Sequence, residues 1–138
     1  MSNPSPIRVF VADDHPMIRA GLRAMIDAEA AFSFVGEATH GEEAVQRMPA
    51  IAPDVALMDL MMPRLDGISA IARLRPLLPA TRFVILTSLL DPAEVRRAID
   101  AGASGYLMKN ASAHELVHVI QAVHAGRRVL DAEVTDAL

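Results

Sequence analysis

The chain has 138 residues, of which 52% are hydrophobic and 22% charged, and its formal net charge is −4. These values suit one globular domain and exclude a wholly disordered chain or a general attraction to nucleic acid or anionic membranes. The absence of cysteine excludes disulfides, thiolate catalysis and cysteine-ligated zinc. No apolar run approaches the roughly 20 residues of a membrane span, and the start of the chain lacks the basic and apolar regions of a signal peptide. We therefore expect a cytoplasmic protein with no membrane partner.

Short aliphatic runs alternate with amphipathic segments along almost the whole chain. The runs are nearly continuous in apolar residues, which is typical of strands buried on both faces of a sheet. They cover residues 7–12, 32–38, 54–58, 82–86 and 105–108. After each run, apolar residues recur at helical spacing, as in the stripe of Ile18, Leu22, Met25 and Ile26.

The limits of the predicted helices carry recognisable capping residues. Asp91 precedes Pro92 and Ser112 precedes Glu115 by three residues, which are patterns typical of helix N-termini. Gly102 lies where a helix is expected to end. Fivefold β-α alternation predicts an α/β fold, a (βα)5 doubly wound five-stranded parallel sheet with helices on both faces.

Polar residues with possible chemistry follow four of the five strands. Asp13 and Asp14 follow the first strand, Asp59 the third, Thr87 the fourth and Lys109 the fifth. The carboxyl ends of parallel strands meet at one edge of the sheet, where such folds bind ligands. Two carboxylates about 5 Å apart repel each other by about 3 kcal/mol at an effective dielectric constant of 20, so we expect a cation among them.

Lys109 supplies one positive charge, and a divalent cation bound by oxygen ligands would supply the rest. Mg²⁺ takes one or two carboxylates together with waters and phosphate oxygens, so the cluster predicts a site for Mg²⁺ and a phosphoryl group. An aspartate held in this way can attack phosphorus, and Asp59 stands alone at the end of its strand. Asp13 and Asp14 are better placed around the metal, although both could instead cap the first helix.

The residues at the strand ends resemble the receiver domain of two-component response regulators, which has a flavodoxin-like fold. The resemblance covers about residues 7–126 and is closest to the NarL/FixJ (LuxR-type) class. It is carried by Asp13, Asp14, Asp59, Thr87 and Lys109 and by the runs ADDHPMIRAGL, GEATHGEEA, MDLMMPRLDG and AGASGYLMKNA.

The resemblance implies a role for each matching residue. Asp59 would accept a phosphoryl group from a phosphohistidine on a cognate sensor histidine kinase. Asp14, Asp59 and the backbone carbonyl of Met61 would bind Mg²⁺ directly, with Asp13 acting through water. Thr87 and Lys109 would contact the phosphoryl group, and Tyr106 would change rotamer together with Thr87. The protein would be a signalling switch and not a metabolic enzyme, limited to its own phosphorylation and dephosphorylation, and a homodimer is possible.

The resemblance also predicts the domain organisation. Residues 1–126 would form the receiver, and residues 127–138 would begin a linker to a C-terminal helix-turn-helix domain that this chain lacks. DNA binding and transcriptional control would therefore reside in that missing domain. Two alternatives stay open at this point: a stand-alone receiver that acts through protein contacts, and an aspartyl-nucleophile phosphohydrolase. Met61 counts against the hydrolase, because haloacid-dehalogenase-type enzymes place a second aspartate two residues after the nucleophile.

Overall fold

A computed structural model describes residues 5–89 and 91–130. Its core is a parallel sheet in which the strand order is β2-β1-β3-β4-β5, followed by a short sixth strand. All five predicted strands are present, with limits within one residue of the sequence prediction. They are β1 (Ile7–Ala12), β2 (Phe32–Ala38), β3 (Val55–Asp59), β4 (Arg82–Thr87) and β5 (Gly105–Met108).

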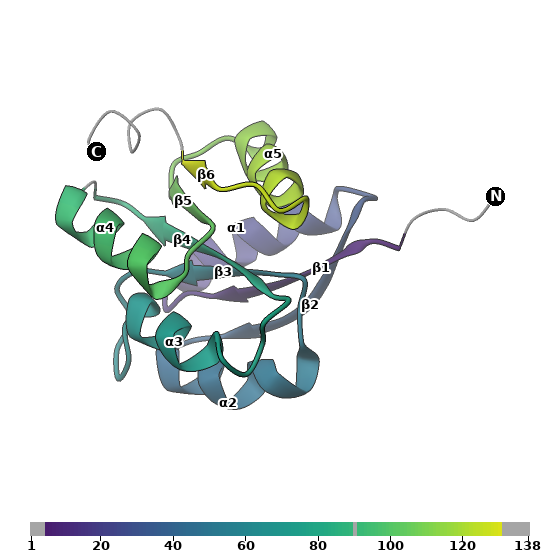
Figure 1. The fold of residues 1–138 in the computed structure, drawn as a ribbon. Helices are drawn as coiled ribbons and strands as arrows, with labels where there is room; N and C mark the ends of the chain where they lie inside the picture. The colour runs from purple at the N-terminus through teal and green to yellow at the C-terminus, as the bar shows by residue number, and fades with distance from the viewer. Residues whose placement is uncertain (1–4, 90, 131–138) are drawn as a thin grey trace.

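Five helices cover the two faces of the sheet, so the predicted doubly wound (βα)5 architecture is confirmed (Figure 1). Helices α1 and α5 pack on one face, and α2, α3 and α4 pack on the other. Their bounds are α1 (Pro16–Asp27), α2 (Gly41–Ile51), α3 (Gly67–Leu74), α4 (Pro92–Ala101) and α5 (Ala113–His124).

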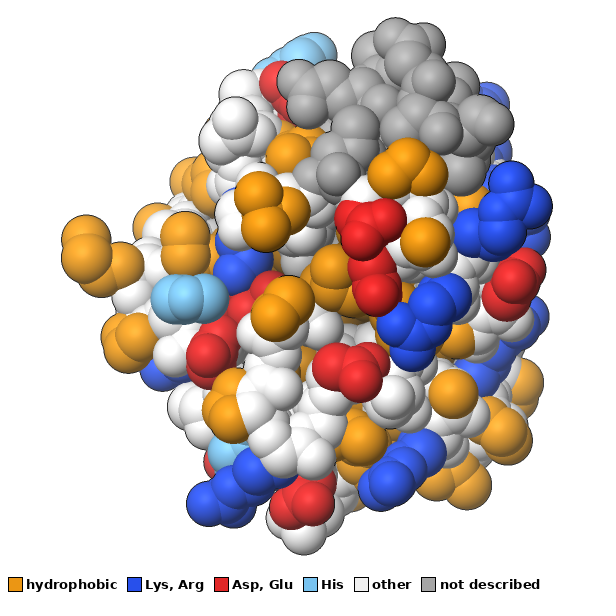
Figure 2. Space-filling view, turned by 90° about the vertical axis from the view of Figure 1, so that its left-hand side faces the viewer, with side chains coloured by type: hydrophobic (Ala, Val, Ile, Leu, Met, Phe, Trp, Pro, Cys, Tyr) orange, Lys and Arg blue, Asp and Glu red, His pale blue; other side chains and the backbone are white. Residues whose placement is uncertain are grey.

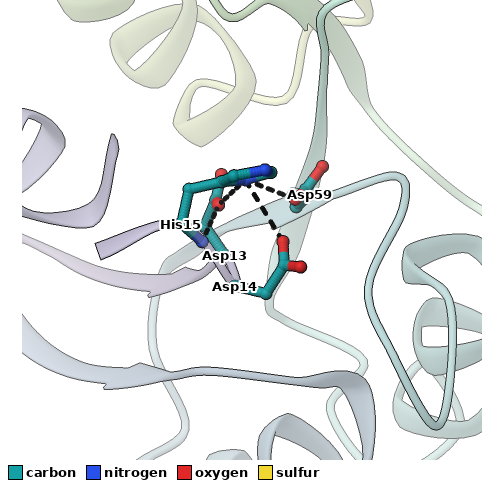
Figure 3. Close-up of side chains that lie close together, drawn as sticks. All are labelled: Asp13, Asp14, His15 and Asp59. Carbon is teal, nitrogen blue, oxygen red and sulfur yellow. Dashed lines mark hydrogen bonds and ion pairs between the residues drawn. The ribbon is translucent and has the colours of Figure 1, made fainter. Parts of the chain in front are cut away.

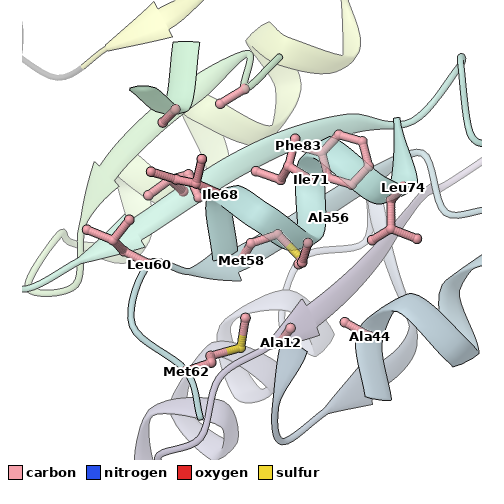
Figure 4. Close-up of a cluster of buried hydrophobic side chains, with 14 of the residues drawn as sticks. Ala12, Ala44, Ala56, Met58, Leu60, Met62, Ile68, Ile71, Leu74 and Phe83 are labelled. Carbon is pink, nitrogen blue, oxygen red and sulfur yellow. The ribbon is translucent and has the colours of Figure 1, made fainter. Parts of the chain in front are cut away.

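Two hydrophobic clusters, one on each face, join the sheet to the helix layers. Because successive strand residues point to opposite faces, Val9 and Val11 of β1 join the cluster beneath α1 and α5, whereas Phe10 and Ala12 join the other. Figure 4 labels members of the cluster that contains Phe10 and Ala12, where it surrounds β3 and α3. The strands are apolar throughout because both of their faces are buried, and polar chemistry is therefore displaced to their ends.

The helix caps agree with the sequence prediction except at α1. The side chains of Asp91 and Ser112 accept hydrogen bonds from the first turns of α4 and α5, and Gly102 ends α4 with a φ of 113°. By contrast, α1 begins after His15 with no side-chain cap. The capping alternative for Asp13 and Asp14 is therefore wrong, and both carboxylates are left for the site described below.

The sheet has one strand more than the five predicted. Strand β6 (Val129–Leu130) pairs in parallel with Gly105 and Tyr106 of β5, and Val129 N–H donates to the Ser104 carbonyl at 2.8 Å. It falls in residues 127–138, the stretch predicted to begin a linker, of which residues 131–138 lie outside the described part of the chain. Within the described residues, no helix is long and apolar enough to cross a membrane.

Candidate functional site

Neighbouring strands bring three carboxylates together at the edge where the sheet ends. Ala12 of β1 pairs with Met58 of β3, so Asp13 and Asp59 follow adjacent positions in the register. Asp13 is fully buried and Asp59 is 2% exposed, whereas the Asp14 side chain is 31% exposed. Figure 2 looks onto the corresponding side of the molecule, where acidic side chains lie beside a histidine and protruding hydrophobic side chains. The predicted convergence of the acidic residues is thus what the structure shows.

Lys109 supplies the positive charge of this cluster. Its backbone N–H donates to the Thr87 carbonyl at 2.7 Å, which holds the residue at the end of β5 beside β4. Its Nζ lies 3.0 Å from Asp59 Oδ2 and 3.1 Å from Asp13 Oδ2, and its side chain is only 11% exposed. One ammonium group therefore bridges two carboxylates that come from different strands.

Burial and charge change the proton affinities of these groups. Burial raises the pKa of Asp59 to about 6, and the neighbouring Asp13 adds to the rise, while Lys109 opposes it. Burial by itself would lower the pKa of Lys109, but its hydrogen bonds to Asp59 and Asp13 raise it above the ordinary lysine value. The ammonium therefore stays charged, and Asp59 holds its proton more tightly than an exposed aspartate does.

His15 lies over the carboxylates, and the sequence analysis assigned it no role. Its backbone N–H donates to Asp13 Oδ1 at 2.8 Å. Its ring Nδ1 lies 2.9 Å from the same oxygen, 3.2 Å from Asp14 Oδ1 and 3.7 Å from Asp59 Oδ2 (Figure 3). The only feature of the sequence that could have indicated a role for His15 is its position directly after Asp13 and Asp14.

The remaining predicted residues lie around this cluster in different ways. Thr87 is 4% exposed, and its hydroxyl donates to the Leu89 carbonyl at 2.9 Å, so it turns toward its own loop. Tyr106 is 1% exposed within the cluster beneath α3 and α4. Met61 N–H donates to Asp59 Oδ1 at 3.3 Å. The role of the Met61 carbonyl and the rotation of Tyr106 stay predictions.

The donor set fits a divalent cation. Asp13, Asp14, His15 and Asp59 each offer one ligand atom, and these atoms lie within 4.8 Å of one another. Lys109 pairs with Asp13 Oδ2 and Asp59 Oδ2, so one ammonium faces three clustered carboxylates, and Asp14 Oδ1 is buried without a hydrogen bond among the described residues. Three carboxylates with one ammonium leave a net negative charge, and carboxylate oxygens are the ligands that Mg²⁺ prefers.

A groove of about 900 Å³ opens beside Asp59 and leaves room for a phosphoryl group. It runs between the loops that follow β3 and β4 and reaches Glu94 and Arg97 on α4. Met61 and Leu89, which are 72% and 74% exposed, line it. The site is therefore open to solvent between these loops and closed on its other side by the ends of the strands.

Comparison with known proteins identifies the family. Residues 9–121 match the family described as the response regulator receiver domain. The chain belongs to that family. The receiver is 35% identical over 129 residues to the response regulator protein VraR of Staphylococcus saprophyticus, covering 94% of this chain and 62% of VraR. It thus spans about three fifths of the length of the curated relatives it matches.

Solved receiver structures are also similar. The receiver domain of the response regulator NarL from Mycobacterium tuberculosis is 37% identical, with a TM-score of 0.86, and the match covers 90% of this chain and all of that one. A LuxR-family response regulator from Aurantimonas sp. is 35% identical, with a TM-score of 0.91, over 96% of this chain and 95% of that one. The expected likeness to NarL and LuxR-family regulators is confirmed.

The raised pKa of Asp59 predicts that Asp59→Asn stabilises the receiver at neutral pH. Because the folded state holds the proton up to a pKa of about 6, against 3.8 for an ordinary aspartate, the wild type loses stability as the pH rises between these values. The full shift corresponds to about 3 kcal/mol, and asparagine has no carboxyl group to ionise.

Urea unfolding at about pH 7.5 and about pH 4 measures the effect. We expect the variant to be more stable than the wild type at the higher pH and the difference to shrink at the lower one. Asp27→Asn, which changes an exposed carboxylate on α1, controls for the lost charge. A difference independent of pH would contradict the prediction.

Proposed function

We propose that Asp59 accepts a phosphoryl group from a phosphohistidine on a cognate sensor histidine kinase, and that its phosphorylation switches an output. The observation that carries this proposal is the buried carboxylate of Asp59, 3.0 Å from the Lys109 ammonium and beside Asp13 at the end of neighbouring strands. It is the arrangement that a nucleophile for phosphoryl transfer needs, because positive charge is held where the transferred group would lie.

In the proposed transfer, a carboxylate oxygen of Asp59 forms the new bond to phosphorus. The bond between phosphorus and the histidine nitrogen of the kinase breaks, and that nitrogen keeps the electron pair. Lys109 would pair with a phosphoryl oxygen in place of one of its carboxylate contacts. The catalysis supplied by the receiver is then orientation and charge, which is consistent with a switch that acts only on itself.

Asp14, Asp59 and the Met61 carbonyl would hold Mg²⁺, with Asp13 acting through water. A bound Mg²⁺ supplies positive charge to the phosphoryl oxygens and to the crowded carboxylates. Support comes from the clustering of three aspartates around one ammonium and from Asp14 Oδ1, which is buried without a hydrogen bond among the described residues. Asp13 also pairs with Lys109 and accepts a hydrogen bond from the His15 backbone N–H. It therefore fixes the positions of these two residues and contributes negative charge to the site.

The switch would begin at Thr87. Its hydroxyl is engaged with Leu89, and a phosphoryl group on Asp59 would offer it stronger charged acceptors. Movement of Thr87 would change the space next to Tyr106 and alter the surface formed by α4, β5 and α5. Phosphorylation would thereby shift an existing equilibrium between two conformations.

The output proposed is transcription, through a LuxR-type helix-turn-helix domain C-terminal to this chain. The relatives support it, because the receiver spans only 62% of VraR and resembles a LuxR-family regulator. DNA would be bound by that domain alone, since this chain is acidic. The domain limits at residues 126 and 127, a homodimer and a cytoplasmic location stay predictions.

Incubation with acetyl phosphate and Mg²⁺, followed by intact-mass measurement, tests the proposal. We expect the wild type to gain one phosphoryl group and Asp59→Asn to gain none. Asp27→Asn, on the exposed face of α1, is the matched control and should gain mass as the wild type does. A phosphoryl group that persists in Asp59→Asn would reject Asp59 as the acceptor, and no gain in the wild type would reject the function.

A further inference from the structure

Asp13 is held through its main chain as well as through its carboxylate. Its backbone N–H donates to the Ala38 carbonyl of β2 at 3.1 Å. Its own carbonyl accepts a hydrogen bond of 2.8 Å from Nη1 of Arg19, which lies near the start of α1. Because β1 ends one residue earlier, at Ala12, Arg19 fixes a peptide group that lies beyond the regular strand.

Arg19 is itself held in place by Glu37 of β2. Its Nε lies 2.9 Å from Glu37 Oε1, and the Arg19 side chain is only 17% exposed. Arg47 donates to the Glu37 carbonyl, so the main chain of Glu37 is fixed as well. A guanidinium is planar and its N–H donors point in fixed directions. Bound through Nε and Nη1 at once, Arg19 therefore fixes the Asp13 carbonyl relative to β2.

The position of the peptide group between Asp13 and Asp14 determines where the charges of the site lie. Asp13 Oδ2 lies 3.1 Å from Lys109 Nζ, which in turn lies 3.0 Å from Asp59 Oδ2. Asp14 follows the same peptide group, and its carboxylate belongs to the same cluster (Figure 3). A misplacement of about 1 Å can lower the rate of a reaction by about 100-fold. A contact that fixes this peptide group is therefore able to control the reaction.

We propose that Arg19, held by Glu37, is a positioning residue for the phosphorylation of Asp59. It fixes the peptide group that follows Asp13 and thereby places the Lys109 ammonium and the clustered carboxylates before Mg²⁺ and the phosphoryl donor bind. Arg19 acts through Asp13 and not on the reacting atoms. This inference rests on the proposed function, because it concerns the same reaction.

Arg23 offers a matched control, because it lies one turn further along α1 and shares a partner with Arg19. Its Nη1 lies 3.5 Å from Glu37 Oε2, and its guanidinium lies over the Phe34 ring at 4.6 Å. Among the described residues, it has no hydrogen bond or ion pair with Asp13. Arg19→Met and Arg23→Met therefore remove the same charge from the same helix, but only the first frees the Asp13 carbonyl.

The rate of phosphoryl gain from acetyl phosphate is measured against Mg²⁺ concentration in both variants, with urea unfolding to show that each is folded. We expect Arg19→Met to raise the Mg²⁺ concentration at half-maximal rate by about tenfold, the lower range for losing a residue that orients metal ligands. Arg23→Met should leave it nearly unchanged, because it removes only exposed ion pairs. If the Arg19–Glu37 pair served stability alone, Arg19→Met would be less stable without any change in this concentration.

The Lys109 ammonium gives a second readout that needs neither metal nor phosphoryl donor. Lys109 is the only lysine of the chain, so an isotope-labelled receiver has one side-chain ammonium signal. Without Mg²⁺ and at a single pH, this signal should move in Arg19→Met and not in Arg23→Met, although two contacts separate Arg19 from Lys109. An unmoved signal in Arg19→Met, or the same Mg²⁺ dependence in both variants, would overturn the inference.

Two further variants keep the inference testable if Arg19→Met does not fold. Arg19→Lys keeps the charge, but a compact ammonium lacks the fork that binds Glu37 and Asp13 together. Glu37→Ala leaves Arg19 without the carboxylate that holds it. Both should shift the two readouts in the same direction as Arg19→Met. Wild-type readouts in Arg19→Lys would show that charge alone suffices, and wild-type readouts in Glu37→Ala would show that Glu37 does not hold Arg19, so either result contradicts the inference.

The two proposals fail in different ways. If the wild type gains no phosphoryl group from acetyl phosphate and Mg²⁺, the proposed function fails. If the wild type gains one while Arg19→Met matches Arg23→Met in both readouts, this inference alone fails.

Discussion

Replacing Gly67 by alanine should destabilise the receiver by about 3 kcal/mol, the upper range for overpacking, and should impair phosphorylation as well. A Cβ at Gly67 would lie 2.3 Å from the Asp59 carbonyl oxygen and 3.3 Å from a methyl group of Ile85. Neither side can yield easily, because Gly67 N–H donates to the Leu60 carbonyl at 3.0 Å and Asp66 caps α3 just before it. The added methyl group must therefore displace the end of β3, which carries Asp59.

Gly21→Ala is the matched control for this substitution. Gly21 lies inside α1, and a Cβ there would have no atom within 4 Å. Alanine should stabilise the helix by about 0.5–1 kcal/mol. Urea unfolding and phosphoryl gain from acetyl phosphate are measured for both variants. A Gly67→Ala receiver that matches the wild type in both would show that the loop after β3 can move away without disturbing Asp59.

The strands were predictable because each is buried on both faces. Runs such as IRVFVA and FSFVGEA coincide with β1 and β2 to the residue. The positions of Asp13, Asp59 and Lys109 at one edge followed from the parallel arrangement alone, since strand ends in such a sheet share an edge. Their convergence therefore needed no knowledge of side-chain conformations, although the distances from Lys109 Nζ to the two carboxylates did.

Other features depended on contacts that the sequence does not encode locally. Nothing in the order of residues separates an imidazole that caps α1 from one that faces the carboxylates, yet His15 does the latter. Strand β6 has two residues and follows two arginines, so it has the appearance of linker until it pairs with β5. Thr87 is at the predicted strand end, but its hydrogen bond to Leu89 could be known only from the loop conformation.

Replacing Lys109 by methionine should lower the free energy of unfolding by about 3–5 kcal/mol at neutral pH, the usual cost of removing one partner of a buried ion pair. Phosphoryl gain should fall by about 100-fold or more, because the charge beside the transferred group is lost. Lys109 is the only lysine among the 13 basic residues of the chain. Its compact ammonium lies within 3.1 Å of two carboxylates, a position that the wide, planar guanidinium of arginine does not suit.

The same ion pair predicts how the loss is rescued. In Lys109→Met, two buried carboxylates face each other without a cation, so adding Asp59→Asn should restore part of the lost stability although it cannot restore phosphorylation.

Because there is one lysine, an isotope-labelled receiver gives one side-chain ammonium signal, and its titration should occur above the ordinary lysine pKa. In Asp59→Asn that pKa should move down, since the hydrogen bond to Asp59 is the largest influence that raises it. A Lys109→Met receiver as stable as the wild type, with the lysine pKa unchanged in Asp59→Asn, would mean that Lys109 does not neutralise the acidic cluster.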